Sequence, residues 1–281
     1  MIKNIKTTRL TLAVLISLSI AGCEKKDKPA YGDYLPDYET TPTTALRFFV
    51  NFDSTSEAAK QINIRFKDSV SGYPSFFPDN SLTYEPGIQG TAYKGNDSKN
   101  LAYVNSNDFM KSTSFTVAFW EKHDGAPEAD AQFVMSVPSS QGHWSNSGML
   151  LIFDHKGAGS TKDSAVIKLM VAEVGNGDHW FELTGANRMP NILDNQWHHL
   201  AFAYDETTSK MQIFRDGELW STQSWDGHGA MHLDADKATG FYLGGKTTDW
   251  GKAFNGSLDQ FRLYNKALSA SEVNELFTTK E

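Results

Sequence analysis

Short apolar runs separated by polar turns fill the chain from Leu46 to its C-terminus. Many runs have a period of two, as in the segment FTVAFW at 115–120, which is typical of strands with one buried face. The pattern predicts strands over Leu46–Phe52, Ile62–Phe66, Phe115–Glu121, Gln132–Val137, Met149–Asp154, Val166–Val174, Trp180–Thr184, Trp197–Asp205, Met211–Arg215, Glu218–Thr222, Phe241–Leu243 and Leu258–Tyr264.

Turn and helix signals complete the predicted architecture. Asp216-Gly217 lies between two predicted strands and predicts a tight hairpin, because both residues tolerate positive φ. Ser269-Ala270-Ser271-Glu272 is a capping box that predicts a short helix to about Phe277. With no long interior helix, this pattern predicts an all-β sandwich.

The N-terminus has the layout of a secretory signal. Lys3, Lys6 and Arg9 precede the apolar run 10–20, which is shorter than the ~20 residues of a membrane-spanning helix. Small residues then precede Cys23, the single cysteine of the chain. This ending resembles the lipobox of bacterial lipoproteins, which implies cleavage after residue 22 and lipidation of Cys23. The alternative is an ordinary signal peptide with a cysteine near its end by chance.

Cleavage would leave a polar, proline-containing tether at 23–44 ahead of the predicted domain at 45–281. It would also remove three basic residues, which moves the formal charge from -8 to -11. Such an acidic chain is not expected to bind nucleic acid, and we expect membrane contact only through the lipid. The expected location is the bacterial cell envelope, and Glu24 after Cys23 favours the outer membrane where the cell has one.

Three segments carry a family resemblance: Ser114–Trp120, Asn195–Gly217 and Phe254–Ser269. They are similar to signature segments of the laminin-G-like, concanavalin A-like jelly-roll family. The resemblance covers roughly Leu46 to Glu281 and implies a concanavalin A-like jelly-roll sandwich with a short C-terminal helix. It leaves function open, because the family includes lectins, adhesins, accessory modules and enzymes.

Catalytic residues are not evident in the sequence. Laminarinase-type enzymes on this fold carry a Glu-x-Asp-x-x-Glu strand, and no segment matches that pattern. Asp234-Ala235-Asp236 has part of the spacing but lies in a Gly- and His-rich stretch. A polysaccharide lyase would use a basic residue and a tyrosine, which leave no sequence pattern. No catalytic residue is therefore assigned.

The family resemblance also implies a structural Ca²⁺ near the first and last strands. The matching positions are Asp53 and Asp259, with backbone carbonyls near Gly95 completing the shell. In the alternative reading, the two aspartates only form a turn and accept local backbone N–H groups. The segment 226–236, with two His and three Asp, is a second metal candidate that would suit zinc, against a solvated loop.

Four tryptophans lie outside the obvious core strands, in segments rich in Gly, Asn, Asp, His or Ser: Trp144, Trp180, Trp225 and Trp250. Aromatic faces beside polar groups are what sugar rings need for binding. The rival interpretation is burial of these rings beneath long loops.

The preferred function is a surface-anchored, non-enzymatic module that binds extracellular carbohydrate through these aromatics. The alternatives are a protein-binding or structural envelope module, and a lyase or glycoside hydrolase on the same fold.

Overall fold

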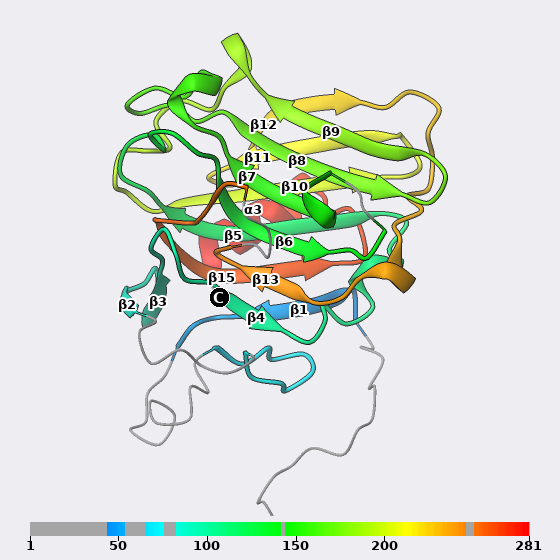
Figure 1. Ribbon diagram of the computed structural model, residues 1–281, viewed down its shortest axis with the longest axis horizontal. Coiled ribbons are helices and arrows are strands. Elements are labelled where there is room, and N and C mark those ends of the chain that lie inside the picture. The colour runs from blue at the N-terminus through cyan, green and yellow to red at the C-terminus, as the bar shows by residue number, and fades with distance from the viewer. Residues whose placement is uncertain (1–43, 54–65, 76–82, 142–143, 246–249, 281) are drawn as a thin grey trace, which may run out of the picture. The chain divides into compact units, whose positions relative to one another are not determined.

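Two sheets stack face to face with a hydrophobic core between them (Figure 1). The computed structural model describes residues 44–53, 66–75, 83–141, 144–245 and 250–280, all within the unit Glu39–Glu281 of the chain. The predicted signal at 1–22, Cys23 and all but the last residue of the predicted tether lie outside these described residues. Among the described helices, none is long and apolar enough to cross a bilayer.

The larger sheet has eight strands, seven of them in one continuous path. In order across the sheet these are β12 (Glu218–Ser224), β11 (Lys210–Arg215), β10 (His198–Asp205), β5 (Phe115–Lys122), β15 (Ser257–Tyr264), β3 (Thr91–Lys94) and β2 (Thr83–Pro86). The eighth strand, β1 (Leu46–Val50), pairs with β15 off this path.

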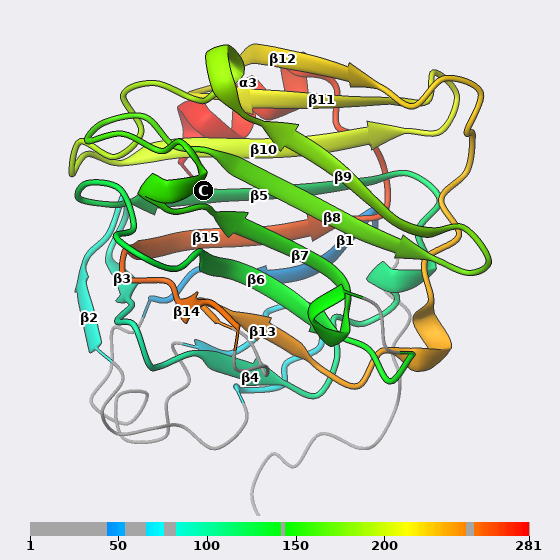
Figure 2. The same ribbon diagram turned by 45° about the horizontal axis from the view of Figure 1, so that its top comes forward.

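The second sheet has seven strands and lies in front of the first in Figure 2. Its path runs through β4 (Leu101–Tyr103), β13 (Phe241–Leu243), β6 (Gln132–Pro138), β7 (Ser147–Phe153), β8 (Ile167–Glu173) and β9 (Gly177–Leu183). The short β14 (Lys252–Ala253) pairs with β6 in parallel. At one side of the sandwich, the Gln223 side-chain amide of β12 bonds both the N–H and the carbonyl of Glu182 in β9, so it links the two sheet edges.

The predicted all-β sandwich is confirmed. Eleven of the twelve predicted strands coincide with observed ones, and the twelfth, Ile62–Phe66, lies outside the described residues except for Phe66. The pattern missed β2, β3, β4 and β14, which have two to four residues each. The predicted hairpin is also present, with φ of 52° at Asp216 and 80° at Gly217, as a two-residue turn of this kind requires.

The helix α3 (Ala270–Thr279) covers the outer face of the eight-stranded sheet (Figure 2). Its capping box is present: the Ser269 side chain accepts from the Glu272 N–H, and the Glu272 side chain accepts from the Ser269 N–H. Leu268 and Val273, one on each side of the first turn, pack together on the sheet as a hydrophobic staple. The helix is therefore held by a polar cap and an apolar contact at the same end.

This helix corrects one sequence expectation. The alternation at 115–120 predicts a strand with one exposed face, yet every residue of β5 before Lys122 is buried. Phe115, Val117 and Phe119 face the core between the sheets, while Ala118 packs beneath α3. Both faces of β5 are covered because the C-terminal helix occupies the side that would otherwise be solvated.

We predict that Ser269→Ala lowers the free energy of unfolding by about 1 kcal/mol, because the Glu272 N–H loses its side-chain acceptor. Urea denaturation of the full-length chain measures this change. Ser271→Ala, in the same turn but with a hydroxyl that takes no part in the capping box, serves as the matched control and should not lower the midpoint. Equal midpoints for both variants would show that the cap does not stabilise α3.

Candidate functional site

Three tryptophans from separate segments meet on the outer face of the seven-stranded sheet. Trp144 begins a short 3₁₀ helix between β6 and β7, Trp180 lies in β9, and Trp250 precedes β14. The Trp144 ring centroid lies 4.8 Å from that of Trp180 and 4.5 Å from that of Trp250, both in edge-to-face geometry. We call these three residues the tryptophan cluster.

The tryptophan cluster lies beside an apolar floor on β6, β7 and β8. Trp180 packs against this floor, and the Trp250 ring meets that of Phe133 edge to face at 5.5 Å. The floor consists of Ala131, Phe133, Leu150, Ile152, Met170 and Ala172. Trp144 and Trp250 remain 37% and 43% exposed, so the cluster is anchored underneath and open above.

Local backbone conformation places two of these rings. Ser145 and Asn146 have φ of 54° and 49°, so the chain turns sharply just after Trp144. The backbone N–H of Trp144 donates to the Asp178 carboxylate at 3.0 Å, which ties this loop to β9. After Trp250, a Cβ at Gly251 would lie 2.7 Å from the Phe133 ring, so only glycine lets the loop approach β6 this closely.

A charged row lies beside the tryptophan cluster. Lys168 pairs across strands with Glu182, two residues beyond Trp180 on the same face of β9. The Lys168 ammonium lies 2.9 Å from Asp154 and 3.5 Å from Glu182. Burial acts to raise the pKa of Asp154, but hydrogen bonds from His155 and Lys168 hold it below its ordinary value. Sequence reasoning missed this row, although the Trp180–Glu182 spacing is the signal that would have found it.

Trp225 does not join the tryptophan cluster. Its ring stacks between His179 and His228, with 3.6 Å between centroids on each side, and it packs against the main core. His179 is the neighbour of Trp180 in β9, and adjacent strand residues point to opposite faces. Trp225 and Trp180 therefore lie on opposite sides of the same strand.

In the segment 226–236, the His228 side chain forms hydrogen bonds with other residues of the domain. His228 Nε2 lies 2.7 Å from the buried Glu173 carboxylate, and its Nδ1 lies 2.9 Å from the Tyr204 hydroxyl. The second Glu173 oxygen accepts from the His232 N–H at 2.6 Å. Among the described residues, no three His, Cys, Asp or Glu side chains are grouped to hold a metal ion. This Tyr–His–Glu chain fastens the segment to β8 and β10.

Asp53 and Asp259 flank one tight turn at 87–91. The Asp53 carboxylate accepts from the Thr91 N–H at 2.8 Å, and the Asp259 carboxylate accepts from the Ile88 N–H at 2.8 Å. A Cβ at Gly90 would lie 2.0 Å from an Asp53 oxygen, and one at Gly87 would lie 2.4 Å from an Asp259 oxygen. Both glycines thus leave room for carboxylate oxygens against the backbone.

The electrostatics of this pair favour a cation. Burial, followed by the charge of Asp53, raises the pKa of Asp259 to about 7. Burial likewise raises the pKa of Asp53, against the Thr91 hydrogen bond. Two carboxylates beside turn carbonyls form the hard oxygen set that suits Ca²⁺, whose charge would offset their burial.

Gly95 lies away from this pair. Its N–H donates to the Gly256 carbonyl at 2.8 Å, beyond the end of β3 opposite to Thr91. A Cβ there would meet the Phe254 carbonyl oxygen at 1.9 Å, so Gly95 allows close packing on the start of β15.

Comparison with known families decides the classification. The sequence model of the family described as "Concanavalin A-like lectin/glucanases superfamily" (Laminin_G_3) matches residues 94–274, more than half of the chain. The chain belongs to this superfamily. Among curated proteins, no sequence matches it significantly.

Solved structures of the same fold include carbohydrate-binding and toxin domains. One is domain 4 of AbnA, an extracellular arabinanase from Geobacillus stearothermophilus, solved in complex with arabinotriose. It has a TM-score of 0.53 and 17% sequence identity, and the match covers 82% of this chain and 97% of that domain. The binding domain of Botulinum neurotoxin DC, solved with SialylT, has a TM-score of 0.55 and 12% identity, covering 84% of this chain and 52% of the toxin chain. The chain thus spans about half of that toxin domain. At these identities the likeness shows the fold alone.

Proposed function

We propose that the domain is a glycan-binding module and that the tryptophan cluster is its binding surface. The observation that carries this proposal is the convergence of Trp144, Trp180 and Trp250 from three segments onto one half-open surface. A solvent-facing group of large aromatic rings marks a binding site more often than a chance arrangement.

The chemistry of the surface suits a sugar. The exposed faces of Trp144 and Trp250 would stack on the apolar C–H face of a pyranose or furanose ring. Lys168 and Glu182 offer a donor and an acceptor for hydroxyl groups beside the rings, and the buried Asp154 holds the Lys168 ammonium in place. Solved relatives of the same fold bound to arabinotriose or SialylT support this ligand class by analogy.

The proposed module acts without catalysis. The Tyr204–His228–Glu173 chain combines groups that can act as acid and base, but its Tyr and Glu side chains are buried. The hydrogen bonds of this chain hold the segment 226–236 against β8 and β10. A polymer at the tryptophan cluster would lie on the opposite face of β9 from this chain.

We predict that Trp144→Ala weakens glycan binding about tenfold, or about 1.4 kcal/mol, through loss of one stacking face. An array of immobilised glycans first selects a ligand for the full-length chain, and calorimetry then compares the variants. Tyr84→Ala, which removes an exposed aromatic ring from β2 in the other sheet, is the matched control and should bind as the wild type. An array without hits, alongside a stable protein complex on purification, would favour the protein-binding alternative instead.

We also propose that Asp53 and Asp259 hold a structural Ca²⁺ with carbonyls of the turn at 87–91. The close oxygen approach to Gly87 and Gly90 and the buried like charges support this proposal. The ion would tie β15 to the hairpin between β2 and β3, and it would replace a disulfide in an exported chain with one cysteine.

We predict that, without calcium, the free energy of unfolding of the domain falls as pH rises from about 4 to 7, because Asp259 loses its proton. The pKa of Asp259 is about 7 in the folded chain, above its ordinary value of 3.8. Without calcium, in the presence of a chelator, protonation of Asp259 therefore contributes to the free energy of unfolding. This contribution is fully present below pH 3.8 and is lost as pH rises through 7. Calcium requires the ionised form, so it should stabilise most above pH 7, by about 2.7 kcal/mol at a hundred times its Kd. Thermal unfolding with calcium or chelator across pH measures both effects.

Asp259→Asn should abolish the calcium effect and flatten the pH dependence. Asp226→Asn, at an exposed carboxylate in another loop, should preserve both. Identical melting with calcium and with chelator at pH 8 would exclude the calcium site.

Finally, we propose that Cys23 carries lipid and anchors the domain to the cell envelope. The apolar run, the small residues and the single cysteine support this proposal. In a bacterium that processes lipoproteins, the wild type should incorporate labelled palmitate and partition into detergent. Cys23→Ser should do neither, whereas Glu24→Gln should do both. Labelling of the Cys23→Ser variant would refute lipidation at this cysteine.

A further inference from the structure

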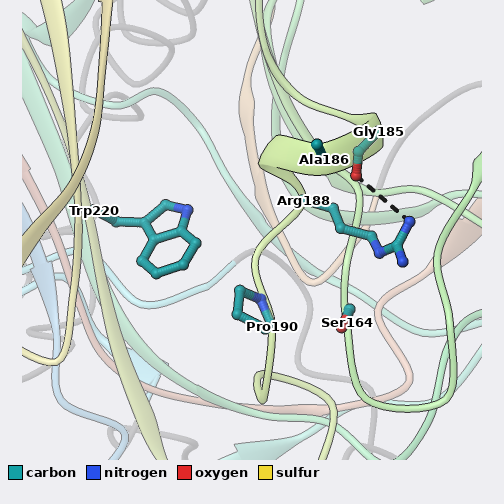
Figure 3. A pocket seen from close by; sticks show the side chains of 6 residues that line it. All are labelled: Ser164, Gly185, Ala186, Arg188, Pro190 and Trp220. Carbon is teal, nitrogen blue, oxygen red and sulfur yellow. Dashed lines mark hydrogen bonds between the residues drawn. The ribbon is translucent and has the colours of Figure 1, made fainter.

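A cavity lies at the edge of the sandwich, and its lining residues are distinct from those of the tryptophan cluster. Its volume is about 300 Å³, at the lower end of the range for small-molecule sites. The lining residues are Ser164, Gly185, Ala186, Arg188, Pro190 and Trp220. Figure 3 shows the Trp220 indole on one side and Arg188, Gly185 and Ser164 on the other, with Pro190 between them.

A break in strand pairing sets the position of Trp220. Along β12, Ser221 pairs with Ile213 and Leu219 pairs with Phe214, which leaves Trp220 as the extra residue of a β-bulge. Bulges redirect a side chain that a regular strand would point elsewhere. The Trp220 ring remains 39% exposed, at the edge strand of the larger sheet.

Arg215 holds the two apolar walls in place. Its Nη1 donates to the Pro190 carbonyl at 2.7 Å, and its guanidinium carbon lies 5.1 Å from the centre of the Trp220 ring. One side chain thereby contacts both walls, and the cation–π contact fixes the indole plane. The cavity is therefore organised before a ligand arrives.

Arg188 supplies a charged donor group that the fold uses only weakly. Its Nη1 donates to the Gly185 carbonyl at a long 3.4 Å (Figure 3). A guanidinium carries five N–H donors and is always protonated, and its geometry matches a carboxylate. The Ser164 hydroxyl donates to Asp163 at 3.1 Å, which leaves its oxygen free to accept from a ligand hydroxyl.

The charge of the cavity contrasts with that of the chain. The formal net charge is -8, yet two of the six arginines in the sequence, Arg188 and Arg215, contact this cavity or its walls. Asp216 lies 3.7 Å from the Arg215 guanidinium and Asp163 accepts from the Ser164 hydroxyl, whereas no described carboxylate pairs with Arg188. An anionic ligand is thus favoured at this point of an otherwise acidic protein.

We infer that this cavity is a second saccharide site, selective for a sugar that carries a carboxylate, such as a uronic acid. The sugar ring stacks on Trp220 against Pro190, its carboxylate pairs with Arg188, and a hydroxyl donates to Ser164. Because it shares no residue with the tryptophan cluster, this site does not depend on the glycan-binding role proposed for that cluster.

The test uses the full-length chain labelled with ¹⁵N, with the Trp220 indole N–H signal assigned from Trp220→Ala. The probes are the methyl glycosides of glucuronic and galacturonic acid and their neutral counterparts, glucose and galactose. At least one acidic glycoside should shift the Trp220 signal and bind at least tenfold more tightly than its neutral match. Arg188→Gln should remove that preference and keep the wild-type fold, and Trp220→Ala should remove binding.

Trp144→Ala separates the two sites and should leave acidic-glycoside binding unchanged. Equal affinity for acidic and neutral glycosides, an unchanged preference in Arg188→Gln, or no Trp220 shift with any probe would overturn the inference. Loss of acidic-glycoside binding in Trp144→Ala would overturn it as well, because the ligand would then belong to the tryptophan cluster.

Discussion

Burial of the central strands on both faces is the constraint on which the rest of this structure depends. Every residue of β6 and β7 is buried, and so is nearly every residue of β5 and β15. A two-layer sandwich by itself covers only the inner face of each sheet. The outer faces carry apolar side chains too, and exposing them to water would cost about 25 cal/mol per Å². Each outer face therefore needs its own cover.

The two faces meet this need differently, and the difference separates scaffold from site. On the larger sheet, α3 lies on the alanine-rich surface of β5 and β10 and closes it with Leu268 and Val273. On the smaller sheet, cover comes from loops and an edge strand that carry the tryptophan cluster. The helix buries Val273 fully and Leu276 in part, whereas Trp144 and Trp250 keep part of their rings in solvent. The side covered by aromatic loops is thus the side on which large rings stay partly exposed.

The sequence predicted most strands because they are short apolar or alternating runs between clear turns, and it predicted α3 because its capping box is local. It could not predict double-sided burial, since the cover of a strand comes from distant residues such as those of α3. The polar composition of the surrounding segments indicated Trp144, Trp180 and Trp250 as candidates, but it could not distinguish them from Trp225. That distinction depends on strand parity in β9 and on packing between His179 and His228. Trp220 escaped notice because its exposure results from a register shift within a regular-looking strand.

Three of the candidate groups, Trp144, Trp220 and Asp259, lie where the regular strand ladder is interrupted, whereas Trp180, Lys168 and Glu182 lie in the regular β8–β9 ladder. Where a strand is covered on both faces, such an interruption lets a side chain leave the packed surface. Trp144 precedes two residues of positive φ, and Trp220 is a bulge residue. Asp259 lies where β15 leaves its pairing with β3 and takes up β1, next to Gln260 with φ of 47°. Its carboxylate bonds the Ile88 and Gln260 N–H groups at this break, so backbone donors left by the interrupted ladder help to hold the charge.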